Sequence, residues 1–361
     1  AWGPCEGLVI TRYGYARPCE GIEIVEAAHP VPDMAGVQAT QRMLELLGTA
    51  GEGDFVLALI SGGGSALLCA PAPGISLEEK QALTDALLAS GAPIGEINGI
   101  RKQISAVKGG KLAAAAWPAQ MLALMISDVP GDDPGDIASG PTVGDHGDAA
   151  RALEALARWG VSPAPSIQSF HEAGGAPLAP DHPHLSQVDN RIYAAPAQSL
   201  AAAADLARAA GIEVRLLGDA IEGEAREVAA GQAQMALEAR GAVPVLFLSG
   251  GELTVTRTGD GIGGPNAEFC LALALALDGA PGIYALACDT DGVDGAAEVA
   301  GALITPDTLA RAAAAGEDPQ TALLRNDAHG FFDRIGQQVV TGPTLTNVND
   351  FRAILMLPEG A

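Results

Sequence analysis

Basic residues, and lysines above all, are scarce in this chain. Of its 361 residues, 20 are lysine or arginine and 44 are aspartate or glutamate, which gives a formal net charge of −24 at pH 7. The four lysines are Lys80, Lys102, Lys108 and Lys111. A chain this acidic is repelled by nucleic-acid phosphates and by anionic membrane surfaces. We therefore expect neither nucleic acid nor a membrane as a partner, and an anionic ligand would need a local positive site.

Cysteines are also few, and a long uninterrupted apolar segment is missing. The five cysteines are Cys5, Cys19, Cys69, Cys270 and Cys288. Their odd number and wide scatter indicate neither a disulfide framework nor a thiolate metal site, so we expect a cytoplasmic protein. The longest strongly apolar stretch, 269–288, is divided by Asp278, Gly279 and Pro281 into pieces too short to cross about 30 Å of hydrocarbon. The N-terminal residues show no secretory-signal pattern.

Short apolar runs alternate with longer helical patterns along the chain. The runs that we interpret as strands are 7–11, 22–27, 55–61, 121–129, 212–218, 243–250 and 282–289. Helical patterns between them include 36–47, 77–90, 199–210 and 225–239. This alternation is typical of an α/β fold in which helices cover both faces of largely parallel, Rossmann-like sheets.

The length of the chain favours two domains, because single cores rarely grow beyond about 250 to 300 residues. We place the boundary near residue 241, which gives domains of residues 1–241 and 242–361. Residues 190–240 are left open to pack with either side.

The segment ISGGGSALL, residues 60–68, is an apolar run that breaks at Ser61–Ser65 and then resumes as a helical pattern. Glycines at the carboxyl end of a strand let the backbone approach an anion closely, and N–H groups at the start of the next helix point toward it. The segment is neither a Walker loop nor a nucleophile elbow, because no Gly-Lys-Ser/Thr follows and Ser65 lacks the G-x-S-x-G frame. It predicts a phosphate-binding turn; an ordinary turn that needs positive φ is the alternative.

Charged residues gather in three further places. Arg101, Ser105 and Lys108 recur at helical spacing on one face of 98–111, where the alternative is a solvated helix surface. Two expected strands are followed by aspartates, namely Asp128, Asp132 and Asp133 after one, and Asp289, Asp291 and Asp294 after the other. Mg²⁺ prefers one or two carboxylates together with phosphate and water, whereas capping and turn formation are the structural alternative.

A different chemistry is indicated by Gly259, Gly261 and Gly264, which fit G-x-G-x-x-G and therefore the outline of a dinucleotide-binding loop. The preceding residues alternate apolar and polar side chains, as an edge strand or hairpin does, whereas the first strand of a dinucleotide fold is central and apolar.

A series of motifs, in order through nearly the whole chain, resembles the glycerate 2-kinase family. They are HPVPD (29–33), ISGGGSALL (60–68), EINGIRKQISAVKGGKLA (96–113), ISDVPGDDPGDIASGPTV (126–143), LSGGELTV (248–255), GGPNAEF (263–269), DTDGVDG (289–295) and TGPTLTNVND (341–350). The C-terminal part is similar to the MOFRL domain, and some members of the family are labelled hydroxypyruvate reductases. The resemblance implies two α/β domains flanking a cleft, and transfer of the γ-phosphoryl group of ATP, with Mg²⁺, to D-glycerate, giving 2-phosphoglycerate.

The resemblance also implies roles for particular residues. The phosphate-binding group would be Ser61, Gly62, Gly63, Gly64, Ser65 and Lys108. The catalytic group would be Arg101, Lys102 and Asp291, and the metal ligands would be Asp128 and Asp289. The second domain would line its side of the cleft with Glu252, Asn266, Glu268, Asn347, Asn349 and Asp350. His29, next to Pro30, is interpreted as structural.

There are departures from the family pattern. Members usually carry a strand, a glycine-rich turn with a lysine, and a helix before the position of Ala1, so the N-terminal domain is expected to lack that first strand and helix. Pro265 stands where some relatives have arginine, and Ala267 where glutamine is common.

Three functions therefore stay open. The first is a glycerate kinase with ATP and D-glycerate as partners, with a homodimer left open. The second is an NAD(P)-dependent hydroxypyruvate or tartronate semialdehyde reductase, which a central parallel strand leading into Gly259–Gly264 would favour, whereas a hairpin there would favour the kinase. The third is a noncatalytic sensor of small acids.

Overall fold

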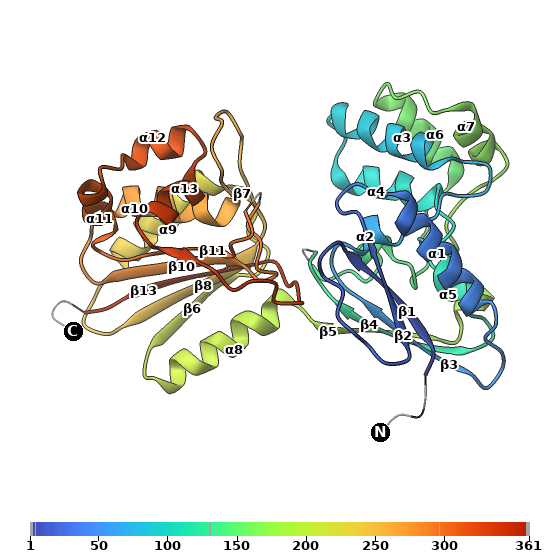
Figure 1. Ribbon diagram of the computed structural model, residues 1–361, viewed down its shortest axis with the longest axis horizontal. Coiled ribbons are helices and arrows are strands. Elements are labelled where there is room, and N and C mark those ends of the chain that lie inside the picture. The colour runs from blue at the N-terminus through green and yellow to red at the C-terminus, as the bar shows by residue number, and fades with distance from the viewer. Residues whose placement is uncertain (1–2, 4, 130, 296, 359–361) are drawn as a thin grey trace. The chain divides into compact units, whose positions relative to one another are not determined.

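The chain divides into two compact units, residues 1–193 and 194–361. The structure is a computed structural model that describes residues 3, 5–129, 131–295 and 297–358. Both units combine helices with sheets, so the predicted α/β class is confirmed (Figure 1). Across these described residues, no helix is both long enough and apolar enough to cross a membrane.

The first unit contains two small sheets with parallel pairings. Strand β1 (Gly7–Arg12) pairs in parallel with β2 (Ile22–Ala27), and β3 (Phe55–Ile60) pairs in parallel with β4 (Gln120–Ile126). Strand β5 (Val188–Ala194) lies on the other side of β4. The expected strands 7–11, 22–27, 55–61 and 121–129 are thus present.

The helices of the first unit form two groups. Those nearest the strands are α1 (Met34–Leu47), α2 (Gly64–Leu67), α5 (Lys111–Ala115) and the short 3₁₀ helices η1 (Ile137–Ser139) and η2 (Pro183–Leu185). The others are α3 (Leu77–Ala89), α4 (Ile94–Gln103), α6 (Ala149–Arg158) and α7 (Pro165–Glu172), which share a core of their own. Figure 1 shows this second group at one end of the unit.

Local sequence explains where these helices begin. Asp33 accepts a hydrogen bond from the Gly36 N–H at the start of α1, and Asp148 does the same for the N–H groups of Ala150 and Arg151 in α6. Helix α3 begins with a capping box formed by Ser76 and Glu79. Each cap satisfies N–H groups that the first turn of a helix leaves without an intrahelical partner.

One face of β3 stays exposed in this chain, although helices were expected on both faces of the sheets. Phe55 is 51 % exposed, Leu57 46 % and Leu59 70 %. These three residues alternate along the strand and therefore share one face.

The second unit has a six-stranded sheet in the order β12-β11-β10-β13-β8-β6. The strands are β6 (Glu213–Gly218), β8 (Val245–Gly251), β10 (Ile283–Asp289), β11 (Gly301–Ile304), β12 (Gln338–Val339) and β13 (Asp350–Met356). Only the β6–β8 pairing of this sheet is parallel, in the residues described; the pairings of β13 with β8 and β10, and of β11 with β10 and β12, are antiparallel. The expectation of largely parallel sheets thus describes the first unit, whereas this sheet is mixed.

The mixed direction has a simple cause. Strand β13 enters from the C-terminal end of the chain between β8 and β10 and runs opposite to both. Because β8 and β10 both run opposite to β13, they point the same way, and their carboxyl ends meet at one edge of the sheet beside the beginning of β13.

Helices cover both faces of the six-stranded sheet. Helix α8 (Pro196–Ala209) packs on one face through Leu200 and Ala204, which contact Leu248. The opposite face carries α9 (Ala225–Glu238), α10 (Pro265–Leu277), α11 (Thr308–Ala315), α12 (Pro319–Leu324) and α13 (Ala328–Arg334) (Figure 1). Helix α10 is buried on every side from Asn266 to Ala274, which accounts for the apolar stretch that begins at Phe269.

The predicted boundary near residue 241 differs from the division at 193/194. Strand β6 pairs with β8, and α9 contributes Ala225, Ala229 and Ala233 to the core of the second unit. Residues 194–240, which the sequence left open, therefore pack with the second unit.

Candidate active site

The predicted turn at Ser61–Ser65 lies at the carboxyl end of β3 and leads into α2. Gly63 has a φ of 77°, a value that favours glycine. A side-chain carbon on Gly64 would lie 2.8 Å from Cβ of Ala138, so only glycine lets η1 approach this closely. Within the described parts of the chain, no group accepts a hydrogen bond from the N–H of Gly62, Gly63 or Ser65. The turn thus presents three N–H donors, and its residues are partly exposed.

Lys108 lies fully buried behind this turn. Its Nζ donates to the carbonyl oxygen of Ser65 (2.8 Å), to Oγ of Ser65 (3.2 Å) and to the carbonyl oxygen of Ala138 (3.3 Å). Burial lowers the pKa of Lys108 well below its usual value, and the positive charges of Lys80 and Arg101 add to the effect. Since its three contacts are protein oxygens, Lys108 fastens the turn to η1; it is placed to hold the turn in position rather than to bind phosphate itself.

Lys102 is also engaged by the protein. Its Nζ lies 3.2 Å from Oδ1 of Asp136 and 3.0 Å from Oδ2 of Asp145, and the residue is 6 % exposed. The two carboxylates compensate its charge, which makes Lys102 a structural link between α4 and the loop that follows β4.

Arg101 is different, because no ion pair holds it among the residues that the structure describes. Its Nη1 donates to the neutral amide oxygen of Asn98 (3.2 Å), and its Nε is buried without a hydrogen-bond partner. Burial lowers the pKa of Arg101. Nearby, Nζ of buried Lys80 contacts Sγ of Cys69 at 3.6 Å. This corner of the first unit therefore holds positive charge that carboxylates do not balance, as an anion-binding site requires.

The aspartates after β4 are divided between two roles. Asp133 accepts a hydrogen bond from the Gly135 N–H (2.7 Å), as the turn-forming alternative predicted. Asp128 is partly buried, and this burial raises the pKa of its carboxyl group. Asp128 and Asp289 are the two expected metal ligands. Asp128 belongs to the first unit and Asp289 to the second. In the described residues, no group of three or more His, Cys, Asp or Glu side chains is arranged to hold a metal ion.

Polar residues of the second unit meet at the edge of the sheet where β8 and β10 end. Asp350, at the beginning of β13, pairs with Gly251 on one side and with Asp289 on the other. Nδ2 of Asn266, in the first turn of α10, donates to Oδ1 of Asp350 (2.6 Å), and Nη1 of Arg352 donates to Oδ2 of Asp350 (2.9 Å). The structure thus brings Asn266, Asp289 and Asp350 to one place.

Asp289 carries the most perturbed carboxyl group of this edge. Burial raises its pKa to about 8, and the negative charges of Asp291 and Asp350 contribute to the rise. Its Oδ1 accepts a hydrogen bond from the Asp291 N–H (2.8 Å), and Oδ1 of Asp291 accepts one from the Val293 N–H (2.7 Å). The negative charge that these carboxylates share would be relieved by a bound cation.

Asp294, the third aspartate of the DTDGVDG motif, is a structural residue. Its carboxylate accepts hydrogen bonds from the N–H groups of Asn266 (3.0 Å) and Ala267 (2.8 Å), and it lies 3.0 Å from Nε2 of His329. It therefore caps α10 from a different segment of the chain. The sequence gives no indication that His329 belongs here, because 34 residues separate the two positions.

The remaining predicted residues of the second unit have separate surroundings. Glu268 is 1 % exposed and pairs with Nε of Arg226 (2.6 Å) and with Nδ2 of Asn326 (3.0 Å), so it joins α10 to its neighbours. Oδ1 of Asn347 accepts a hydrogen bond from the N–H of Asn349 (2.9 Å), whose carbonyl oxygen accepts hydrogen bonds from Thr290 just after β10. Glu252 follows β8 and is exposed.

Close packing accounts for the glycines that fit G-x-G-x-x-G. Side-chain carbons on Gly259 and Gly261 would lie 2.2 Å from the carbonyl oxygen of Arg325 and 2.4 Å from Cβ of Asp327. Residues 252–258 separate Gly259 from β8, and the short β9 (Leu253–Thr254) pairs in parallel with β7 (Gly223–Glu224). Strand β9 therefore does not form the hairpin that would favour the kinase. A dinucleotide-binding loop requires a central strand that leads into its glycines, and no such strand precedes Gly259 in the described residues.

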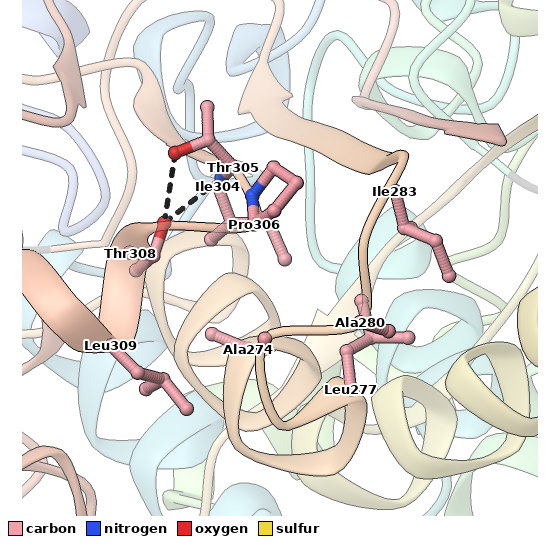
Figure 2. A pocket seen from close by; sticks show the side chains of 10 residues that line it. Ala274, Leu277, Ala280, Ile283, Ile304, Thr305, Pro306, Thr308 and Leu309 are labelled. Carbon is pink, nitrogen blue, oxygen red and sulfur yellow. Dashed lines mark hydrogen bonds between the residues drawn. The ribbon is translucent and has the colours of Figure 1, made fainter. Parts of the chain in front are cut away.

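Two hollows of the second unit lie away from these residues. Figure 2 shows a cavity of about 10 Å³ at the end of α10, lined by Ala274, Leu277, Ile304, Thr305, Thr308 and others. It has room for about one water molecule and is too small for a nucleotide. A more open hollow of about 330 Å³ lies between α9 and the strands β6 and β8, and its lining includes Leu217, Met235 and Phe247.

Two family models match the chain. Residues 1–172 match a domain of unknown function, DUF4147, and residues 245–350 match the MOFRL family. A protein of Agrobacterium vitis with the provisional name hydroxypyruvate reductase is 49 % identical over 97 % of this chain and 81 % of its own length. The D-glycerate 2-kinase of Thermotoga maritima is 39 % identical over 96 % of this chain and 83 % of its own length.

A solved structure gives the same relationship. The crystal structure of glycerate kinase from Thermotoga maritima matches with a TM-score of 0.88 at 38 % identity, and the match covers 98 % of this chain and 85 % of that one. The predicted resemblance is thereby confirmed: the chain belongs to the glycerate 2-kinase family, whose second unit is of the MOFRL type.

Proposed function

We propose that this protein is a glycerate 2-kinase, which transfers the γ-phosphoryl group of ATP to the 2-hydroxyl group of D-glycerate. The observation that carries the proposal is the Ser61–Ser65 turn, which presents three unbonded N–H groups at the carboxyl end of β3. Phosphoryl transfer depends mainly on positioning and on neutralising charge, and such a turn supplies both to a phosphate group.

Residues of the first unit have distinct parts in this proposal. The turn binds phosphate oxygens through its N–H groups, and Lys108 and Ser139 hold it in position through Ser65. Arg101, whose charge no carboxylate balances in the described residues, neutralises the carboxylate or phosphate of a substrate. Both substrates are anions, so a local positive site is needed in a protein with a net charge of −24.

The edge of the second unit fits Mg²⁺. Its oxygen donors are hard ligands, and the pKa of Asp289 is raised to about 8 by burial first and then by the negative charges of Asp291 and Asp350. Asp289 and Asp291 would hold the ion, which supplies neutralisation of phosphate oxygens. The part of Asp128, in the first unit, as a metal ligand stays a separate prediction. Asn266, Arg352 and Asp350 hold this edge rigid through buried hydrogen bonds.

The cytoplasm is the compartment that the proposal assigns, because ATP is available there and because all five cysteines are free thiols. Two further expectations are tested beside this proposal. The effect of the expected N-terminal segment is measured with an extended chain, and the oligomeric state is measured by light scattering.

The test is product formation from ATP and D-glycerate, with and without Mg²⁺, coupled to enolase. Enolase accepts 2-phosphoglycerate but not 3-phosphoglycerate, so the coupled reaction reports the position of the new phosphate. A parallel reaction follows oxidation of NADH and NADPH with hydroxypyruvate. We expect ADP and 2-phosphoglycerate without nicotinamide oxidation; the reverse pattern would replace the kinase with the reductase.

A further inference from the structure

His29, which the sequence suggested to be structural, lies beside the glycine turn. It belongs to the segment between β2 and α1, at the carboxyl end of β2. A side-chain carbon on Gly63 would lie 3.2 Å from Cδ2 and 3.3 Å from Nε2 of His29. The Cδ2–Nε2 edge of the imidazole ring therefore faces the turn, and the residue is exposed.

The segment that carries His29 is held from several sides. The carbonyl oxygen of Pro32 accepts a hydrogen bond from Nε2 of Gln81 in α3 (2.7 Å). The carboxylate of Asp33 accepts hydrogen bonds from the N–H of Gly36 (3.0 Å) and from the hydroxyl group of Tyr13 (2.7 Å). The backbone close to His29 is therefore anchored next to the turn, which limits how far the imidazole ring can move away from it.

Two lysines of the first unit are engaged by protein groups, so neither is assigned to the phosphate. Lys108, which lies behind the turn, donates its hydrogen bonds to Ser65 and Ala138. Lys102 is paired with two aspartates. An imidazole ring carries an N–H donor in either protonation state, and a phosphate oxygen accepts such a hydrogen bond well.

We propose that His29 donates a hydrogen bond from Nε2 to the phosphate group bound by the Ser61–Ser65 turn, and is therefore a further substrate-contacting residue. This inference rests on the proposed kinase function, because that function supplies the phosphate. The turn holds one side of the phosphate with its N–H groups, and His29 reaches it from the side of Gly63.

Three substitutions separate contact by Nε2 from other roles. The amide nitrogen of glutamine can replace Nε2, that of asparagine reaches only as far as Nδ1, and alanine removes both. A hydrogen bond to a charged group is worth enough that we expect His29→Ala and His29→Asn to lower kcat/KM for ATP by about 10- to 100-fold. We expect His29→Gln to stay within about fivefold of the unsubstituted protein, because it keeps the donor. His146→Gln, at another exposed histidine, is the control.

The measurements are kcat, KM for ATP and for D-glycerate, and the midpoint of thermal unfolding for each variant. The unfolding midpoint should not change, since the side chain is exposed. Equal kinetics for the three His29 variants, whether all high or all low, would overturn the inference. If the unsubstituted protein shows no kinase turnover, the proposed function fails. The affinity of the same variants for MgATP, measured by calorimetry, then tests His29: the glutamine variant should bind more tightly than the alanine and asparagine variants.

Discussion

Lys102 shows at the scale of one residue how a charge that looks catalytic in sequence serves the fold. Its ammonium group is buried against Asp136 and Asp145, so its removal leaves two carboxylates facing each other. We expect Lys102→Met to lower the free energy of unfolding by about 1 to 3 kcal/mol. Arg191→Met, at an exposed pair with Asp189, is the control and should cost less than about 1 kcal/mol. Urea unfolding measures both, and equal losses would contradict the structural role.

Lys111, also at the scale of one residue, makes the free energy of unfolding depend on pH. Its Nζ donates to the carbonyl oxygens of Gln103 (3.2 Å) and Ser105 (2.6 Å), while burial and the charge of Lys80 lower its pKa to about 8. An unfolded lysine has a pKa near 10.4, so between about pH 8 and pH 10.4 the unfolded state binds more protons than the folded state. The contribution of Lys111 to the free energy of unfolding therefore rises with pH in that window.

The check is the difference in unfolding free energy between the unsubstituted protein and Lys111→Met, measured from pH 7 to pH 10. We expect the difference to be constant near pH 7 and then to grow in favour of the unsubstituted protein, by less than about 1.4 kcal/mol per pH unit. A difference that is flat or that falls across this range would show that the ammonium group is not disfavoured in the folded state.

At the scale of elements, the contact between α2 and η1 depends on Gly64. A methyl group at this position would collide with Ala138, so we expect Gly64→Ala to lower the free energy of unfolding by about 1 to 3 kcal/mol and to reduce turnover with ATP. Gly231→Ala is the matched control, because Gly231 lies in α9 with open space around it. That substitution should raise stability by about 0.5 to 1 kcal/mol. Stabilisation by both substitutions would mean that η1 can move away.

Elements with a local sequence pattern could be predicted, whereas β13 could not. Strands β3, β4, β8 and β10 are apolar runs, and each was expected close to its observed bounds. Strand β13 contains Arg352 in its middle, and this fully buried guanidinium group is satisfied by Asp350 and by the carbonyl oxygen of Gly250, 102 residues away. A pattern of apolar residues does not reveal a strand that carries a buried guanidinium group, because one of the groups that satisfy it comes from a distant segment.

The same limit applies to the candidate site. The glycine turn is a local feature, so its position at the end of β3 could be read from residues 60–68. The structural roles of Lys102 and Lys108 could not be predicted from the sequence. Their hydrogen-bond partners Asp136, Asp145 and Ser65 lie 34 to 43 residues away along the chain. The position of His29 next to Gly63 likewise depends on how β2 and β3 are arranged in the fold.

At the scale of the whole molecule, the division at 193/194 can be tested with fragments. A fragment of residues 194–361 contains the complete core of the second unit and should unfold cooperatively in urea. A fragment of residues 242–361, cut at the boundary that the sequence suggested, lacks β6 and α9 and should not. Unfolding of both fragments in urea is followed by near-ultraviolet circular dichroism. Cooperative unfolding of the shorter fragment would support the boundary near residue 241 instead.

The exposed face of β3 has a consequence for the colloidal behaviour of the protein. Phe55, Leu57 and Leu59 form an exposed apolar surface on a protein with a net charge of −24. Between two molecules, apolar attraction at short range therefore competes with electrostatic repulsion at longer range. Added salt shortens the reach of that repulsion to about 10 Å at 0.1 M and leaves the apolar attraction in place. Solutions of this protein should therefore be clearest at low ionic strength and scatter more light as salt is added, the opposite of a protein that salt dissolves.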